Sequence, residues 1–408
     1  MHTITRFLQL ATLLIAGSEI ISFAAHAQAV SPACTPKILA NVVVDTAAQR
    51  KAAGEIAEPP LTDKADGFAW PDTPLGVIKT SEGYAFFGSD GGLHSRQEWH
   101  GHWYGNNKYG SVTRTLGTLG NPLGSGPPID VTIKPNPDPA VNPNYQSYDY
   151  MGGGPVYKVP EGRFGAGNLL LVYHAEIPTE TSFYSVFGLA SSTDQGMNWT
   201  DLGEIIRINQ GYRKDLDGFD IGDAPLVFFP DSKYFNIYFP DWHANGTLHW
   251  GNPPTITSIS VARAPIPAVL EAAFGSKPHA IGFEKYYDGW HLDQGLGGYS
   301  KDLDTQTPYG GTLTVAYNAD LKVYQLLINA GVVVYYTDSP DGMNWSPISL
   351  LYDFRNEKDQ PSVYVAFVGM GDDPSLLGKK FYIFYTRYPN NGEGWNGASV
   401  NRFTVSCQ

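Results

Sequence analysis

Carboxylic acids recur beside aromatic residues at several points of the 408-residue sequence, a combination suited to chemistry on sugars. We predict that four of them are catalytic: Asp90, Asp149, Glu176 and Asp223. Paired carboxyl groups perform glycoside hydrolysis: one donates a proton to the leaving oxygen, and the other activates water or attacks the anomeric carbon. Asp149 and Asp223 are the preferred pair, because each comes just before a strand marked by glycine or proline. Either of them can be the acid.

A second set of polar and aromatic residues is predicted to bind the substrate. It consists of Trp70, Asp72, His94, His174, Asp220, Asp241, Trp242, His243, Asp359 and Arg387. Several carboxylates around one opening repel one another and shift each other's pKa values, which is typical of active sites. Taken singly, each residue is equally well interpreted as a solvated turn residue, so the prediction depends on their convergence.

Three histidines lie close together at His94, His100 and His102. A zinc site would need further ligands beside them, and no second ligand cluster is evident, so we predict no metal ligands. A loop that contacts substrate, or plain surface histidines, is the preferred interpretation. No cofactor is predicted either, although a structural calcium ion would leave no sequence signature.

These residues must be positioned by many short strands. The chain contains 45 Gly, 30 Pro, 25 Tyr, 20 Phe and 9 Trp but only 16% charged residues. This composition is typical of aromatic strands joined by tight turns. A short strand is expected at 38–44, and the only clear helical stretch follows it at 46–57.

Five segments repeat a loose pattern: a first strand, a second aromatic strand and a strand–turn–strand pair. First strands are expected at 76–79, 155–159, 225–229, 313–318 and 363–368, and second strands at 83–87, 169–173, 234–238, 323–327 and 381–385. Five four-stranded units predict an all-β fold, a five-bladed β-propeller, with a β-sandwich as the alternative. In a propeller, first-strand starts and second-strand ends meet at the channel mouth, where pockets form.

Two turns mark the boundary between third and fourth strands. Residues 192–199 match the Asp-box pattern S-x-D-x-G-x-x-W, and residues 339–345 are a version one residue shorter. Asp194 and Asp341 are expected to accept backbone N–H bonds across the hairpin while glycine takes positive φ. Their role is therefore structural, and such turns favour propellers of the sialidase and glycosidase type. The long proline-rich stretch at 120–145 is expected to be a surface loop.

The first 29 residues predict a secretory signal peptide, with a basic start, an apolar run and a small-residue end. Residues 30–408 are then expected to form a single β-propeller catalytic domain, secreted to an extracellular or periplasmic space. In that oxidising compartment the two cysteines, Cys34 and Cys407, should pair. We expect the pair to close the ring, with a strand near 42–44 beside residues 403–406.

The net charge limits the kinds of partner that the protein is expected to bind. A net charge of −13 argues against nucleic acid, whose phosphates would be repelled. No stretch after the signal reaches transmembrane length, so no membrane association is expected. We predict a monomer whose partner is a polysaccharide or oligosaccharide.

Residues 72–78 (Asp-Thr-Pro-Leu-Gly-Val-Ile) and 83–90 (Gly-Tyr-Ala-Phe-Phe-Gly-Ser-Asp) resemble the opening of five-bladed propellers that include the endo-D-arabinanases. Residues 152–157 (Gly-Gly-Gly-Pro-Val-Tyr) and the Asp-box spacing also fit that group. The resemblance implies a glycoside hydrolase that cleaves a furanoside-containing polysaccharide of the arabinan type, with Asp90 as a matching acid. Pro74 stands where the family has an aspartate, and Ser89 precedes Asp90.

Two other functions stay open. A sialidase-like exo-glycosidase would need an arginine triad and a tyrosine nucleophile, and no Arg-Ile-Pro start is present. A lectin-like propeller would bind glycans without cutting them.

Overall fold

A computed structural model describes most of the chain, and nearly all of the regular secondary structure that it describes is β-strand. The described residues are 30–46, 49, 73–88, 98–99, 102–103, 110–122, 124, 129–148, 150–180, 183–208, 211–215, 226–227, 233–241, 258–279, 281–291, 296–301, 303, 312–357, 362–387 and 398–408. The all-β prediction is confirmed for these ranges.

The largest sheet has eight strands in two antiparallel halves. Its first half contains β2 (Gly76–Thr80), β3 (Gly83–Gly88), β6 (Gly110–Gly117) and β7 (Ile129–Lys134). Its second half contains β8 (Tyr150–Lys158), β9 (Leu169–Pro178), β10 (Phe183–Ser192) and β11 (Trp199–Ile206). The halves join where β7 and β11 run parallel. A separate two-stranded sheet pairs β4 (Glu98–Trp99) with β5 (His102–Trp103).

Three further sheets follow along the chain. One consists of β12 (Leu226–Val227), β13 (Tyr234–Asp241), β14 (Ser258–Pro265), β15 (Glu284–Tyr286) and β16 (Trp290–His291). The next consists of β17 (Leu313–Asn318), β18 (Val323–Asn329), β19 (Val333–Ser339) and β20 (Ser349–Asp353), with β22 (Leu376–Leu377) beside β17. The last orders β21 (Ser362–Gly369), β23 (Lys380–Arg387), β24 (Ser399–Cys407) and β1 (Pro36–Thr46).

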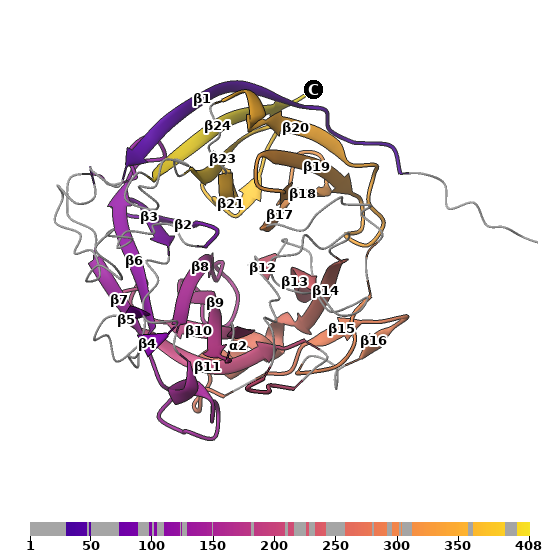
Figure 1. Ribbon diagram of the computed structural model, residues 1–408. Coiled ribbons are helices and arrows are strands. Elements are labelled where there is room, and N and C mark those ends of the chain that lie inside the picture. Colours follow the sequence, from indigo (N-terminus) through magenta and orange to yellow (C-terminus); the bar gives the residue numbers. More distant parts are fainter. Residues whose placement is uncertain are drawn as a thin grey trace, which may run out of the picture.

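The sheets stand around a common centre, with β2, β8, β12, β17 and β21 innermost (Figure 1). Each sheet, or half of the eight-stranded sheet, packs on the next in chain order, and the last packs back on the first. The aromatic pairs at these junctions, with their centroid distances, are Phe87–Trp199 (5.9 Å), Phe187–Phe239 (6.4 Å), Tyr238–Tyr324 (6.3 Å), Phe354–Tyr385 (5.3 Å) and Phe384–Phe86 (6.2 Å). The arrangement is a ring of sheets and not the two facing layers of a β-sandwich.

The predicted second strands are confirmed, because β3, β9, β13, β18 and β23 cover all five ranges. Among the first strands, β8 begins at Tyr150, five residues before the predicted start at 155. Glycines at 152–154 are unusual inside a strand and mark a close backbone approach. A Cβ on Gly154 would lie 2.4 Å from the carbonyl oxygen of Pro74, so only glycine lets the chain before β2 come this near.

Two other expectations are wrong. The stretch at 120–145 contains β7, whose Val131 and Ile133 are buried, so it is not merely a surface loop. An unexpected helix, α2 (Ile266–Phe274), follows β14, with a proline in its first turn and an apolar stripe at helical spacing that is buried. The helix expected at 46–57 lies almost entirely outside the described residues. Short 3-10 helices are η1 (Tyr145–Ser147) and η3 (Phe354–Asn356). None of the described helices is long and apolar enough to cross a membrane.

Both Asp-box turns are confirmed. The carboxylate of Asp194 accepts from the backbone N–H of Asn198 at 2.9 Å, and that of Asp341 accepts from the N–H of Asn344 at 2.8 Å. The turns join β10 to β11 and β19 to β20, as the third-to-fourth position requires. Gly196, in the first turn, has φ of 81°, which explains the glycine of the pattern.

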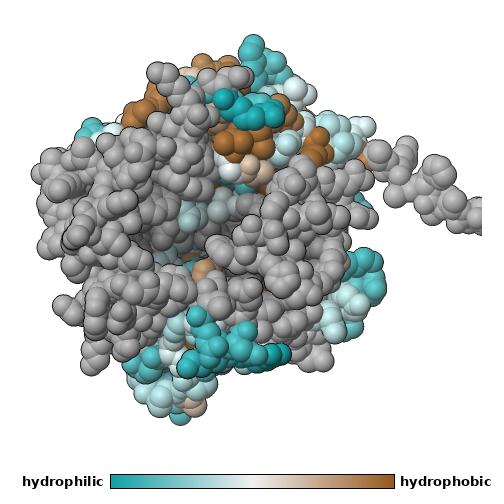
Figure 2. Space-filling model, in the orientation of Figure 1, coloured by the Kyte–Doolittle hydropathy of each residue, from teal (hydrophilic) through white to brown (hydrophobic). Residues whose placement is uncertain are grey.

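The two ends of the described chain lie side by side. A disulfide joins Cys34 to Cys407, and β1 pairs with β24 along its whole length. The expected partners are displaced, since residues 42–43 face 401–402, with register shifts on either side. Leu39 and Val43 on β1 are at least half exposed, and Figure 2 shows hydrophobic atoms gathered over this edge of the molecule. Because β1 buries little apolar surface, its hydrogen bonds and the disulfide hold it in place.

Candidate functional site

The direction in which the inner strands run follows from the residues that line a cavity of about 440 Å³. It is lined by Thr80 at the end of β2, Lys158 at the end of β8, and residues 372–375, which follow β21. These three strands therefore run the same way and end on one face of the ring. Their starts, and the ends of the second strands paired with them, lie on the opposite face, which we call the upper face.

At the upper face, β9 carries two of the predicted site residues close together. Nε2 of His174 lies 3.3 Å from Oε1 of Glu176, with side chains 9% and 21% exposed. They share one face of the strand because alternate residues of a strand point the same way. Tyr150, which opposes Glu176 in register, places its ring 6.0 Å from the His174 imidazole. The site thus combines a partly exposed carboxylate, an imidazole and an aromatic ring, and the first two are groups that can act as general acid or base.

The glycine run of β8 holds His174 in position. Gly152 and Gly154 line a small cavity together with Thr73 and the His174 ring. The Thr73 hydroxyl donates to the carbonyl of Gly153 at 3.1 Å, which ties the chain before β2 to β8. On the other side, Phe187 contacts the imidazole edge-on at 6.0 Å. His174 is therefore packed rigidly, which favours a positioned proton carrier over a loose surface histidine.

Asp241 and Arg387 end β13 and β23, the strands that correspond to β9. Asp241 is 2% exposed and accepts a hydrogen bond from the hydroxyl of Ser300. Arg387 donates to the Glu357 carboxylate at 2.6 Å and lies 5.0 Å above the Phe354 ring. Each is already engaged with the protein, and a role in contacting substrate stays a prediction for both.

The remaining predicted site residues lie outside the described residues, and their convergence on one cleft stays a prediction. They are the catalytic candidates Asp90, Asp149 and Asp223, and the binding candidates Trp70, Asp72, His94, Asp220, Trp242, His243 and Asp359. In the part of the chain that the structure describes, no group of three or more His, Cys, Asp or Glu residues is arranged to hold a metal ion.

Beside this hairpin lies a buried acidic network that was not foreseen from the sequence. Asp201 of β11 is completely buried and accepts hydrogen bonds from the Tyr173 hydroxyl at 2.7 Å and the Asn142 amide at 2.9 Å. The backbone N–H of Gly203 donates to it at 2.8 Å. Desolvation outweighs these bonds and raises the pKa of Asp201 to about 6, and the Glu204 charge adds to the effect.

Glu204 forms the outer part of the same network. Its carboxylate accepts from the Tyr148 hydroxyl at 2.5 Å, from the Asn144 amide at 3.0 Å, and from Nε of Arg207. Burial, and then the Glu204 charge, raise the pKa of Tyr148 well above its usual value, so this hydroxyl stays a donor. The available sequence signal was the charged pair Asp201 and Glu204 on a mainly apolar strand directly after an Asp box.

No profile of a known protein family matches the chain, and no curated protein sequence matches it significantly. Among solved structures, a family 117 glycoside hydrolase from the marine bacterium Zobellia galactanivorans matches with a TM-score of 0.50 at 11% identity, over 92% of each chain. An α-L-arabinanase of Penicillium chrysogenum complexed with arabinobiose matches at 0.47 and 13% identity, over 90% of this chain and 98% of that one. The Zobellia match shows that this chain shares its fold with that structure over nearly its whole length.

Proposed function

We propose that the protein is a secreted, monomeric glycoside hydrolase on a five-bladed β-propeller, with β1 closing the last blade. The succession of antiparallel sheets around one centre supports this architecture, as does the position of β1 at the outer edge of the last sheet. The fold shared with a family 117 glycoside hydrolase supports the enzyme class. Signal cleavage after residue 29 would place the disulfide in an oxidising compartment.

The observation that carries the proposal is the pairing of Glu176 with His174 at the upper end of β9. A proton held between these two groups can be passed to the leaving oxygen of a glycosidic bond. A second carboxylate must then act on water or on the anomeric carbon, and Asp149 and Asp223 are the candidates, with Asp90 next. No resident cofactor is needed for these steps.

The proposed substrate is a furanoside-containing polysaccharide of the arabinan type. The motifs at 72–78 and 83–90 support it, because they resemble the opening of the endo-D-arabinanases. A chain of net charge −13 also suits a neutral polysaccharide better than a polyanion, which it would repel.

A polysaccharide panel with analysis of newly formed chain ends tests the proposal, beginning with arabinan and arabinogalactan. We expect Glu176→Gln, Asp149→Asn and Asp223→Asn each to lower kcat/KM about 10²- to 10⁴-fold. Glu180→Gln is the matched control, because it makes the same change at an exposed position four residues along the chain. Unchanged turnover by Glu176→Gln would remove it from the mechanism. If the wild type binds a glycan tightly but does not cleave it, the protein is a lectin-like glycan binder and the proposed hydrolase activity is wrong.

A further inference from the structure

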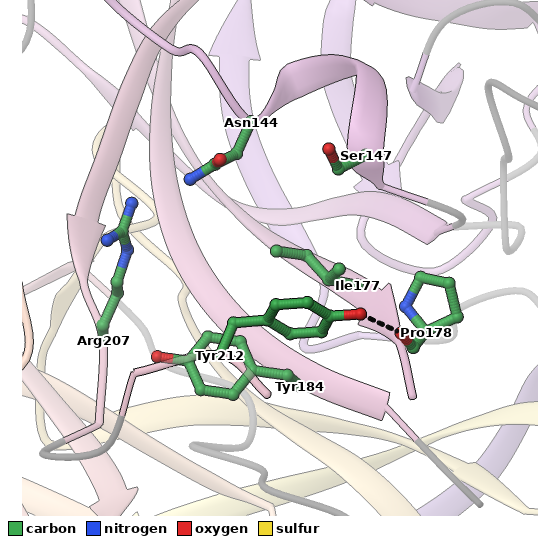
Figure 3. Close-up of a pocket in the computed structure, with 7 residues that line it drawn as sticks. All are labelled: Asn144, Ser147, Ile177, Pro178, Tyr184, Arg207 and Tyr212. Carbon is green, nitrogen blue, oxygen red and sulfur yellow. Dashed lines mark hydrogen bonds between the residues drawn. The ribbon is translucent and has the colours of Figure 1, made fainter. Parts of the chain in front are cut away.

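A recess of about 270 Å³ lies on the upper face beside the acidic network (Figure 3). In Figure 3, Asn144 and Ser147 lie across the recess from the ring of Tyr212, and Arg207 closes one side. Ligand pockets usually measure about 300–1,000 Å³, so this recess is sized for one small ligand unit and not for a long segment.

The walls of the recess offer an aromatic face at fixed orientation. Tyr212 is 44% exposed, its hydroxyl donates to the carbonyl of Pro178 at 2.9 Å, and its ring meets Tyr184 edge-on at 5.9 Å. Tyr184 itself is buried, so it supports the exposed ring from behind. A rigid, partly exposed aromatic ring is a surface on which the apolar face of a small ring compound can rest.

The same walls also carry polar groups that can form further hydrogen bonds. No described residue bonds to the Ser147 hydroxyl, the carboxamide oxygen of Asn144, or the two terminal nitrogens of Arg207. These groups supply both donors and acceptors. A wholly apolar ligand would dehydrate them without replacement bonds, which is unfavourable.

A charged ligand fits no better. Arg207 forms an ion pair with Glu204, whose side chain is only 4% exposed, so its positive charge is already balanced within the protein. An anion would gain little net attraction at such a neutralised pair. The remaining class is a neutral ligand that has several hydroxyl groups and one apolar face, which describes a sugar ring.

We propose that this recess binds one neutral sugar unit, at a site separate from the carboxylates of the channel mouth. Its place supports a role with a polymer: Ile177 lines the recess, and its chain neighbour Glu176 points to the other face of the same β9–β10 hairpin. A polysaccharide that passes over this hairpin reaches both faces. Assigning the sugar to the substrate polymer rests on the proposed function, whereas the sugar class rests on the recess alone.

Calorimetric titration with arabinohexaose and xylohexaose, in a Glu176→Gln background that prevents turnover, tests the proposal directly. We expect binding of at least one of them, weakened about tenfold by Tyr212→Ala, which removes the ring. Ser147→Trp fills the recess from an exposed position and should weaken binding as much, while Tyr212→Phe should keep most of the affinity. Tyr287→Ala is the matched control, because Tyr287 is 41% exposed and also packs on a second tyrosine, Tyr299.

The proposal is overturned if neither hexasaccharide binds, or if Tyr212→Ala and Ser147→Trp bind as well as the control. Hydrolysis of p-nitrophenyl arabinofuranoside and of arabinan by the otherwise wild-type chain separates this result from the proposed function. If either substrate is turned over and the recess variants do not change binding, the sugar-binding role of the recess is refuted and the proposed hydrolase activity is kept. If binding depends on Tyr212 but no glycan is turned over, the proposed hydrolase activity is refuted and the sugar-binding role of the recess is kept. In an active enzyme, Tyr212→Ala should raise KM for arabinan and leave the aryl glycoside unaffected.

Discussion

The buried carboxyl group of Asp201 should make the free energy of unfolding fall as the pH rises from about 4 to about 6. Desolvation raises the folded-state pKa of Asp201 to about 6, against about 3.9 for an aspartate in an unfolded chain. Between these values the folded protein binds more protons than the unfolded one. Stability from this group is therefore fully present below about pH 4 and is lost as the pH passes 6.

The magnitude follows from the shift. About two pKa units at 1.36 kcal/mol each correspond to about 3 kcal/mol of unfolding free energy, as an order of magnitude. Asp201→Asn removes this titration. In the wild type, the Asn142 amide donates to the Asp201 carboxylate at 2.9 Å, and the Tyr173 hydroxyl donates to its other oxygen. The side chain of the new asparagine has only one oxygen, so its N–H₂ must face one of these two donors. That mismatch costs about 1–3 kcal/mol in a buried site.

Urea unfolding of the wild type and of Asp201→Asn at several pH values between 4 and 7 measures the effect. The stability of the wild type relative to Asp201→Asn should fall by about 3 kcal/mol across this range, so that its advantage disappears or reverses, because only the wild type loses stability through this group. Gln146→Ala, at an exposed position of the neighbouring segment, removes no titratable group and should give a difference that does not depend on pH. A constant difference for Asp201→Asn would refute the assigned pKa and the reasoning built on burial.

Three further predictions concern stability. Cys34→Ser opens a link between positions 373 residues apart and should lower the unfolding free energy by up to about 5 kcal/mol, measured by guanidinium titration. It should not change kcat of the proposed glycosidase reaction in the folded protein. Burial lowers the pKa of Lys285 to about 8, so stability should rise by about 3 kcal/mol as the pH increases from 8 to 10.5, and Lys285→Met should flatten that rise in urea titrations. Asp194→Ala removes the Asp-box bonds to Met197 and Asn198 and should cost about 1–2 kcal/mol in thermal unfolding, with activity retained; a loss of activity in the folded variant would contradict its structural role.

The second strands could be located from the sequence because each is an unbroken run of aromatic and β-branched residues. The first strands were harder to delimit. In β8, for example, three glycines follow Tyr150 and Met151, and the close approach of Gly154 to the Pro74 carbonyl is not visible in the local sequence. The strand β7 was not recognised because it lies within a proline-rich stretch. One of its faces is buried only through its pairing with neighbouring strands of the sheet. Local pattern determines an element, whereas its limits depend on contacts made later in folding.

The candidate site was foreseen only in part. His174 and Glu176 were predicted because they end a recognisable strand, and strand alternation alone places them on one face. The network of Asp201, Glu204 and Asn142 could not be predicted, because Asn142 lies 59 positions before Asp201 and each residue resembles an ordinary polar turn or strand residue. Only burial, which is a property of the assembled ring, distinguishes them.

The bond between Cys34 and Cys407 makes the folded chain a covalent loop. A protease that cuts once between these residues therefore produces two pieces that stay attached to each other, and strand pairing keeps the cut ends near their places. Two cuts, or one cut followed by reduction, are needed to release a fragment. The nicked protein should run as one band without reductant and as two bands with it.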